Sequence, residues 1–329
     1  MFTTTRRRIL LALAAAPLLG LHAPKVQASS PLPVVATFSI AADWIRQVGG
    51  DRVQVTSLIG PDADAHGYQP KPSDTRAIKE AALVVGIDLG FDDWVERLAR
   101  SAGKKNDLLL LGKILLAEKA LLSAVALHDG HDHHDRHDAH DHKGDHPAHG
   151  EFDPHFWQDP RLVAQAMPPL AEALAQRDPA HADHYRQRAT EYAHSLESLW
   201  RQWSERFAAL PPDARRAYTN HDAFRYLARA YGLELIGIQG VVPHGELSAK
   251  ALAALADRAR REGIRVAFLE NVADPRLVEQ LRRESGLTVG GRLYSDALNG
   301  PSGPAPTYID LVEVNARTLH EALAASSAR

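Results

Sequence analysis

The stretch PVVATFSIAADWIRQVGGDRVQVTSLIG (33–60) decides the fold class. Two short runs rich in β-branched residues, 33–39 and 53–58, flank a segment near 40–48 whose apolar residues follow a helical spacing. This alternation continues to residue 112 and predicts βαβ units with a parallel sheet. The further elements that we expect in this half are strands at 83–89 and 107–111 and helices at 73–81 and 93–102.

A second region of alternating strands and helices begins near residue 209 and predicts a second α/β lobe. Its first strand is expected within RAYTN (216–220) and its last within LTVGGRLY (287–294). The other expected elements are strands at 233–238 and 266–270 and helices at 223–231, 248–262, 274–285 and 308–325.

Two helices are predicted between these regions, at about 160–176 and 179–208. The second would be about 45 Å long at 1.5 Å per residue, which makes it a candidate rigid connector between two lobes. Its apolar residues recur at spacings of three and four, as in an amphipathic helix: Tyr185, Ala189, Tyr192, Leu196, Leu199, Trp203 and Phe207. The predicted organisation is a signal peptide (1–28), an N-terminal lobe (29–178), a connecting helix (179–208) and a C-terminal lobe (209–329).

The first 28 residues are typical of an export signal. Three arginines (6–8) precede an apolar stretch (9–21), and Val26-Gln27-Ala28 provides a small-x-small cleavage site. The arginine run is compatible with ordinary secretion and with twin-arginine export. Since no other stretch of 18 apolar residues occurs, we expect the exported protein to be soluble. We also expect it to be a monomer and to act in the periplasm.

Cysteine and histidine usage departs from the average. The chain has no cysteine and 18 histidines, and its formal net charge is -3. The absence of cysteine excludes disulfides, zinc–thiolate sites, cysteine catalysis and lipid attachment through cysteine. Because the basic residues form no stripe, nucleic acid is not expected as a partner.

Half of the histidines lie in a segment that contains almost no apolar residues and cannot form a core (128–150). We expect a mobile surface loop within the N-terminal lobe that binds zinc weakly and raises its local concentration. The alternative is a solvated spacer. The accessory ligands would be His128, His131, His133, His134, His137, His140, His142, His146 and His149.

Four other residues are candidate metal ligands, because they lie where predicted parallel strands end and where open sheets bind their ligands. His66 lies in PDADAHGYQP, His155 in DPHFWQDP, His221 directly after AYTN, and Asp296 after GRLYS. Three imidazoles and one carboxylate suit a closed tetrahedral Zn²⁺ site. Each histidine taken alone is more often an ordinary structural or surface residue, so spacing by itself is a weak argument.

The surrounding motifs strengthen the assignment. The segments 61–74 (PDADAHGYQPKPSD), 153–160 (DPHFWQDP), 219–233 (TNHDAFRYLARAYGL) and 293–319 resemble the periplasmic metal-binding proteins of ABC importers for zinc and manganese, the ZnuA/TroA type. The resemblance covers essentially the whole chain after residue 28. It implies two α/β lobes bridged by a long helix, a metal site in the cleft between the lobes, and an inner-membrane permease with a cytoplasmic ATPase as partners. It also implies that His66, His155, His221 and Asp296 are the metal ligands.

The resemblance also bears on the metal. Manganese-selective relatives usually have glutamate at the position of His221, and a third imidazole favours Zn²⁺ over Mn²⁺. Some zinc members have a glutamate at the position of Ala65, so here the fourth ligand is Asp296 or a water molecule. Asp222, Tyr68 and Trp157 are expected to support the site rather than bind metal.

Functions other than zinc import leave few signs in the sequence. A zinc enzyme is not expected, since HExxH is absent and Asp296 would close the open position that catalysis needs. The chain also has no GxSxG, P-loop or GxGxxG motif. A manganese importer component and a periplasmic zinc chaperone or buffer remain alternatives.

Overall fold

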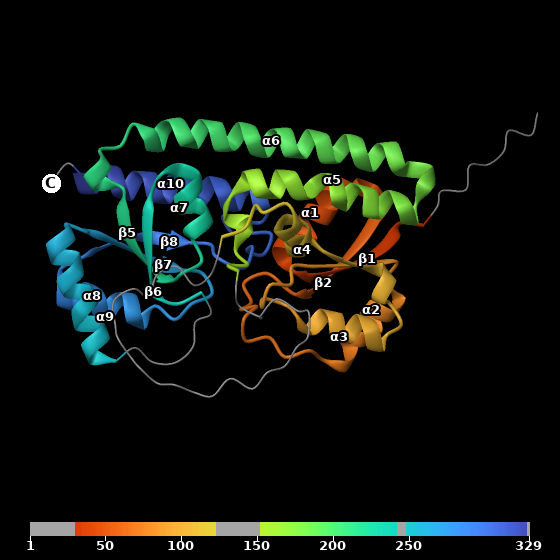
Figure 1. Ribbon diagram of the computed structural model, residues 1–329, viewed down its shortest axis with the longest axis horizontal. Coiled ribbons are helices and arrows are strands. Elements are labelled where there is room, and N and C mark those ends of the chain that lie inside the picture. Colours follow the sequence, from red (N-terminus) through yellow and green to blue (C-terminus); the bar gives the residue numbers. More distant parts are fainter. Residues whose placement is uncertain (1–29, 123–151, 242–247, 328–329) are drawn as a thin grey trace, which may run out of the picture. The chain divides into compact units, whose positions relative to one another are not determined.

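The computed structural model describes residues 30–122, 152–241 and 248–327. The predicted signal peptide and the predicted histidine-rich loop lie outside the described residues. Residues Pro31–Arg329 belong to one compact unit. Two four-stranded parallel sheets within the described part of the chain confirm the predicted α/β fold (Figure 1).

The first sheet has the strand order β2-β1-β3-β4, and all neighbouring strands are parallel. Its central strand β1 is buried along most of its length, as expected for a parallel sheet with both faces covered. The strands are β1 (Leu32–Phe38), β2 (Val53–Ile59), β3 (Leu83–Gly86) and β4 (Leu108–Leu110). The helices of this part are α1 (Ser39–Gly49), α2 (Pro72–Glu80), α3 (Trp94–Ser101) and α4 (Leu111–Ala117).

The second sheet repeats this topology with the order β6-β5-β7-β8, again with parallel neighbours. In both sheets the second strand in sequence lies on one side of the first strand, and the third lies on the other side. This reversal creates a switch point at the carboxyl ends of the strands. The strands are β5 (Arg216–His221), β6 (Glu234–Gln239), β7 (Val266–Glu270) and β8 (Thr288–Leu293). The helices are α7 (Arg225–Tyr231), α8 (Ala249–Glu262), α9 (Arg276–Ser285) and α10 (Tyr308–Ser327).

Two helices lie between the sheets in sequence, α5 (Pro160–Arg177) and α6 (Ala182–Ala208). At 27 residues, α6 is about 40 Å long. Its apolar stripe serves two cores: Tyr185 packs in the core of the first sheet, and Phe207 packs in the core of the second. Leu199, midway between them, contacts both cores. The long helix (green in Figure 1) therefore joins the two lobes through continuous side-chain packing.

No helix among the described residues has both the length and the apolar character needed to cross a bilayer. The predicted lobe boundaries at 178 and 208 stay predictions, since the two sheets belong to the same compact unit.

One predicted strand is shorter than expected. Instead of reaching residue 89, β3 ends at Gly86, because the backbone N–H groups of Ile87 and Asp88 donate to the Asp92 carboxylate at 2.9 and 2.6 Å. The chain then turns with positive φ at Asp88 (74°) and Leu89 (62°). Side-chain capping of this turn thus replaces the strand pairing that the apolar sequence suggested.

Asp92 gives this turn a pH-dependent stability. The side chain is fully buried, and burial raises its pKa from 3.8 to about 6 although the backbone N–H groups of Asp88 and Ile87 oppose the shift. The folded state therefore holds the proton more tightly than the unfolded chain, so this stabilisation is complete below pH 3.8 and is lost as the pH rises through about 6.

We predict that wild-type protein gains about 1 kcal/mol of unfolding free energy from Asp92 when the pH is lowered from 7 to 5. The Asp92→Asn variant should lack this increment. Thermal unfolding of both proteins at the two pH values measures the difference, and an equal pH response in the two proteins would contradict the assignment.

Candidate metal site

The structure brings the four predicted ligands together. One ligand atom from each of His66, His155, His221 and Asp296 lies within 4.8 Å of the others. His66 comes from the loop between β2 and α2, and His155 directly precedes the short helical turn before α5. His221 is the last residue of β5, and Asp296 follows β8. Both sheets therefore contribute through their carboxyl ends, where the topology places a binding site.

Four distances within the cluster, which involve both oxygens of Asp296, are close to those between the ligand atoms of a tetrahedral metal site. The Nε2 atoms of His66 and His221 each lie 3.4 Å from Oδ2 of Asp296, and Nε2 of His155 lies 3.5 Å from Oδ1. The Nε2 atoms of His66 and His155 are 3.3 Å apart. Bonds of roughly 2.0 to 2.1 Å to a central zinc require tetrahedral ligands to stand about 3.3 to 3.4 Å from one another.

Two buried carboxylates orient two of the imidazoles. Oδ1 of Asp153 lies 2.8 Å from Nδ1 of His155 and accepts the backbone N–H of the same residue at 3.0 Å. Oε2 of Glu270 lies 2.6 Å from Nδ1 of His221, and its Oε1 accepts the His221 backbone N–H at 2.9 Å. Each ring thus has a carboxylate oxygen beside its Nδ1, through a hydrogen bond for His155 and through a close contact without hydrogen-bond geometry for His221.

Neither Asp153 nor Glu270 was identified from the sequence. Asp153 could have been found as the acidic residue two positions before His155 in DPHFWQDP. Glu270 ends the buried strand VAFLE, so an acidic side chain at the carboxyl end of a parallel strand was the available signal.

The charged groups of the cluster shift the pKa values of one another. Burial lowers the pKa of His221, but the Glu270 and Asp296 carboxylates outweigh burial and raise that pKa well above its usual value. Burial raises the pKa of Asp296, but His155, His221 and His66 outweigh burial and hold that pKa well below its usual value.

The surroundings of the Asp296 carboxylate show that a cation fits the centre of the cluster. Its side chain is fully buried, and neither oxygen has a hydrogen-bond partner among the described residues. Nε2 of His221 is likewise buried without a hydrogen bond to the described part of the chain. Buried polar atoms without partners are costly, and a divalent cation at this point would satisfy all of them together.

Aromatic rings line the first-lobe side of the cluster. The ring of Phe91 meets His66 edge-on, with centroids 5.3 Å apart and planes at 85°, and Trp157 lies 5.1 Å from His155. Phe91 and Trp157 contact each other at 4.8 Å. Because the Trp157 indole donates to the Ser295 carbonyl at 2.7 Å, this apolar wall also holds the segment that carries Asp296.

Of the supporting residues named from the sequence, Trp157 contacts the ligand His155, and none of the three is among the four clustered residues. Tyr68 donates its hydroxyl to Asp74 at 2.8 Å, and Asp222 pairs with Arg225 at 3.8 Å. The histidines of the predicted accessory loop lie outside the described residues.

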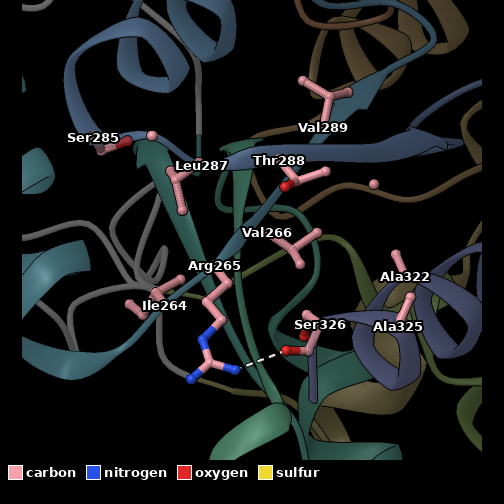
Figure 2. A pocket seen from close by; sticks show the side chains of 12 residues that line it. Ile264, Arg265, Val266, Ser285, Leu287, Thr288, Val289, Ala322, Ala325 and Ser326 are labelled. Atoms are coloured by element: carbon pink, nitrogen blue, oxygen red, sulfur yellow. Dashed lines mark hydrogen bonds between the residues drawn. The ribbon is translucent and has the colours of Figure 1, made fainter. Parts of the chain in front are cut away.

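A cavity of about 420 Å³ lies elsewhere, at the amino ends of β7 and β8 and beside the end of α10 (Figure 2). Its lining contains no histidine, aspartate or glutamate. The one charged side chain there, Arg265, donates to the Ser326 carbonyl at 2.7 Å (Figure 2). The metal-binding chemistry is therefore at the opposite ends of these strands.

Comparison with known proteins identifies related sequences over nearly the whole chain. The family described as zinc-uptake complex component A, periplasmic (ZnuA), matches residues 34–322. The iron-binding protein YfeA of Yersinia pestis is 28% identical over 286 residues, which cover 87% of this chain and 84% of that protein. The manganese-binding lipoprotein MntA of Bacillus subtilis (strain 168) is 27% identical over 301 residues, which cover 90% and 91%.

The periplasmic zinc-binding protein TroA from Treponema pallidum has a similar structure, with a TM-score of 0.76 and 26% sequence identity. The match covers 90% of this chain and all of TroA. These relatives are named for iron, manganese and zinc, so their names agree on metal binding but not on one metal. Since the family match extends over most of the sequence, this chain belongs to the ZnuA family, the extracytoplasmic metal-binding components of ABC importers.

Proposed function

We propose that this protein captures Zn²⁺ in the periplasm and delivers it to an inner-membrane permease that a cytoplasmic ATPase drives. The observation that carries the proposal is the buried cluster of three imidazoles and one carboxylate between the carboxyl ends of the two sheets. We assign His66, His155, His221 and Asp296 as the ligands that hold the transported ion.

The donor set supports zinc. Imidazole nitrogen suits Zn²⁺, whereas Mn²⁺ favours carboxylate, carbonyl and water oxygens. Three of the four proposed ligands are imidazoles, and their Nε2 atoms lie 3.4 to 3.5 Å from an oxygen of Asp296, which leaves room for a central ion.

Manganese is the second candidate, and one feature of Asp296 favours it. His66 and His221 face Oδ2 of this carboxylate, while His155 faces Oδ1. Both oxygens are therefore available to one ion, which would raise the number of ligand atoms above four and suit a harder cation. The names of the manganese-binding relatives point the same way.

Membrane attachment is a second point on which we expect this protein to differ from some relatives. The MntA relatives are named lipoproteins, but this sequence contains no cysteine to carry a lipid. We therefore propose that the protein is exported through its N-terminal signal and acts without a lipid anchor.

Calorimetry on metal-stripped protein tests the site. We predict one tight zinc site per chain in the wild type and loss of that site in the triple variant His66→Ala, His155→Ala, His221→Ala. A matched triple variant of described histidines outside the cluster, His181→Ala, His184→Ala, His320→Ala, should keep it. Tight binding retained by the first variant would contradict the ligand assignment.

The metal needs a separate measurement, because most protein sites bind Zn²⁺ more tightly than Mn²⁺ whatever their role. Mass spectrometry of protein isolated from its own cells should find zinc in the site. A predominance of manganese would overturn the choice of zinc and leave the importer role in place.

Glu270 should contribute to affinity without binding metal. We predict that Glu270→Gln weakens zinc binding about 10- to 100-fold, because a neutral amide supports the His221 imidazole less well than a carboxylate. Competition calorimetry with a chelator measures the change. Glu234→Gln, at the amino end of β6 in the same sheet, is the control and should leave the affinity unchanged. Equal affinities of wild type and Glu270→Gln would contradict the role.

A further inference from the structure

A hydrogen-bonded clasp connects the loop that carries His66 to the segment that carries Asp296. Oδ1 of Asp62 accepts from the Asn299 side-chain amide at 2.5 Å, and its Oδ2 accepts the Gly300 backbone N–H at 3.1 Å. The Asp62 backbone N–H also donates to the Leu298 carbonyl at 2.8 Å. Asp62 follows β2 of the first sheet and Asn299 follows β8 of the second, so the clasp bridges the two lobes.

Asp62 adopts an unusual backbone conformation to make these contacts. Its φ is +57°, in the left-handed region that L-residues other than glycine, asparagine and aspartate rarely occupy. A left-handed non-glycine residue costs free energy and persists where the surrounding contacts enforce it. Here the three hydrogen bonds to the segment 298–300 provide those contacts.

The clasp closes a short ring around one edge of the metal site. Asp62 precedes His66 by four residues, and Asn299 follows Asp296 by three. The two ligands meet at the other side of this ring, where Nε2 of His66 lies 3.4 Å from Oδ2 of Asp296. Neither the loop nor the segment can move away from the other while the clasp is intact.

His66 is the ligand that most needs such support. Among the described residues, no carboxylate pairs with its Nδ1, whereas Asp153 and Glu270 hold His155 and His221. Its side chain is also the most exposed of the four, at 5% against 0–1% for the others. Burial of Ala65 and the bond from the His66 backbone N–H to Asp64 at 2.9 Å hold this loop to its own lobe, and the clasp adds its link to the segment that carries Asp296.

We propose that Asp62 is a positioning residue that holds His66 against Asp296 and thereby slows release of the bound metal. This inference rests on the proposed metal-binding function. Because the clasp fixes two ligands before metal arrives, it lowers the ordering cost of binding, and differences of this kind appear mainly in the dissociation rate. Opening of the site on the His66 side requires the two hydrogen bonds of the Asp62 carboxylate to break.

The variant Asp62→Gly tests the contribution of the Asp62 side chain separately from that of its backbone. Glycine adopts φ near +57° without strain and keeps the N–H bond to Leu298, so only the two carboxylate contacts are lost. Lys119→Gly is the matched control, because Lys119 has φ +56° and takes no part in the clasp. Both proteins are loaded with one equivalent of Zn²⁺ and mixed with excess chromogenic chelator in a stopped-flow instrument.

We expect Asp62→Gly to release zinc about 3- to 30-fold faster than wild type, as the loss of charge-assisted hydrogen bonds predicts. Binding stoichiometry and cooperative thermal unfolding of the metal-free protein should be retained, which separates lost positioning from loss of the fold. Lys119→Gly should release zinc at the wild-type rate. Equal release rates for Asp62→Gly and wild type would overturn the proposal.

A double variant that exchanges the carboxylate and the amide between positions 62 and 299 should restore slow zinc release. Asn299→Asp places two carboxylates against each other and should speed release, as should Asp62→Asn. When both substitutions are combined, the amide introduced at position 62 can donate to the carboxylate introduced at position 299, while the amide oxygen accepts from Gly300. The release rate of this double variant should therefore return toward that of wild type.

If the double variant releases zinc as fast as the faster single variant, the clasp does not act through this pair. Failure of wild-type protein to bind zinc tightly would instead refute the proposed function, so the two failures are distinguishable.

Discussion

The site depends on the burial of the Asp296 carboxylate. A charged group removed from water is costly unless oppositely charged or hydrogen-bonding partners surround it. Here three imidazoles approach its two oxygens, at 3.4 to 3.5 Å, too far for good hydrogen bonds and well placed for a shared cation. The cluster is therefore best satisfied with an ion at its centre, which gives the fold a direct energetic coupling to metal.

The two sheets position the ligands through the same topology. Both sheets have the same strand order, so each has a switch point at its carboxyl edge. Helix α6 joins the two sheets, because Tyr185 packs in the first core, Phe207 packs in the second, and Leu199 contacts both. Shorter links reinforce the arrangement, since the Tyr226 hydroxyl on α7 donates to the carbonyl of Asp153, beside His155. The ligands thus come from four distant parts of the sequence and need little rearrangement to meet.

Much of this arrangement was predictable from the sequence, because it depends on local patterns. Apolar periodicity located the strands and most of the helices, and the motifs around His66, His155, His221 and Asp296 indicated residues that the structure gathers. Helix α4 was missed because the run LLLLGKILLA (108–117) is apolar except at Gly112 and Lys113, and such a short run does not distinguish strand from helix. The partnerships of Glu270 and Asp62 could not be predicted, since they depend on the relative placement of strands and lobes; Asp62 and Asn299 are 237 residues apart.

We propose that one zinc ion is held by three imidazoles and the Asp296 carboxylate. The most direct measurement is a crystal structure of the zinc-loaded protein, with the metal located by its anomalous scattering. We expect zinc bonded to Nε2 of His66, His155 and His221 at about 2.0 to 2.1 Å and to an oxygen of Asp296 at about 2.0 to 2.2 Å. Zinc bound by fewer than three of these imidazoles, or a tight site elsewhere in the chain, would contradict it.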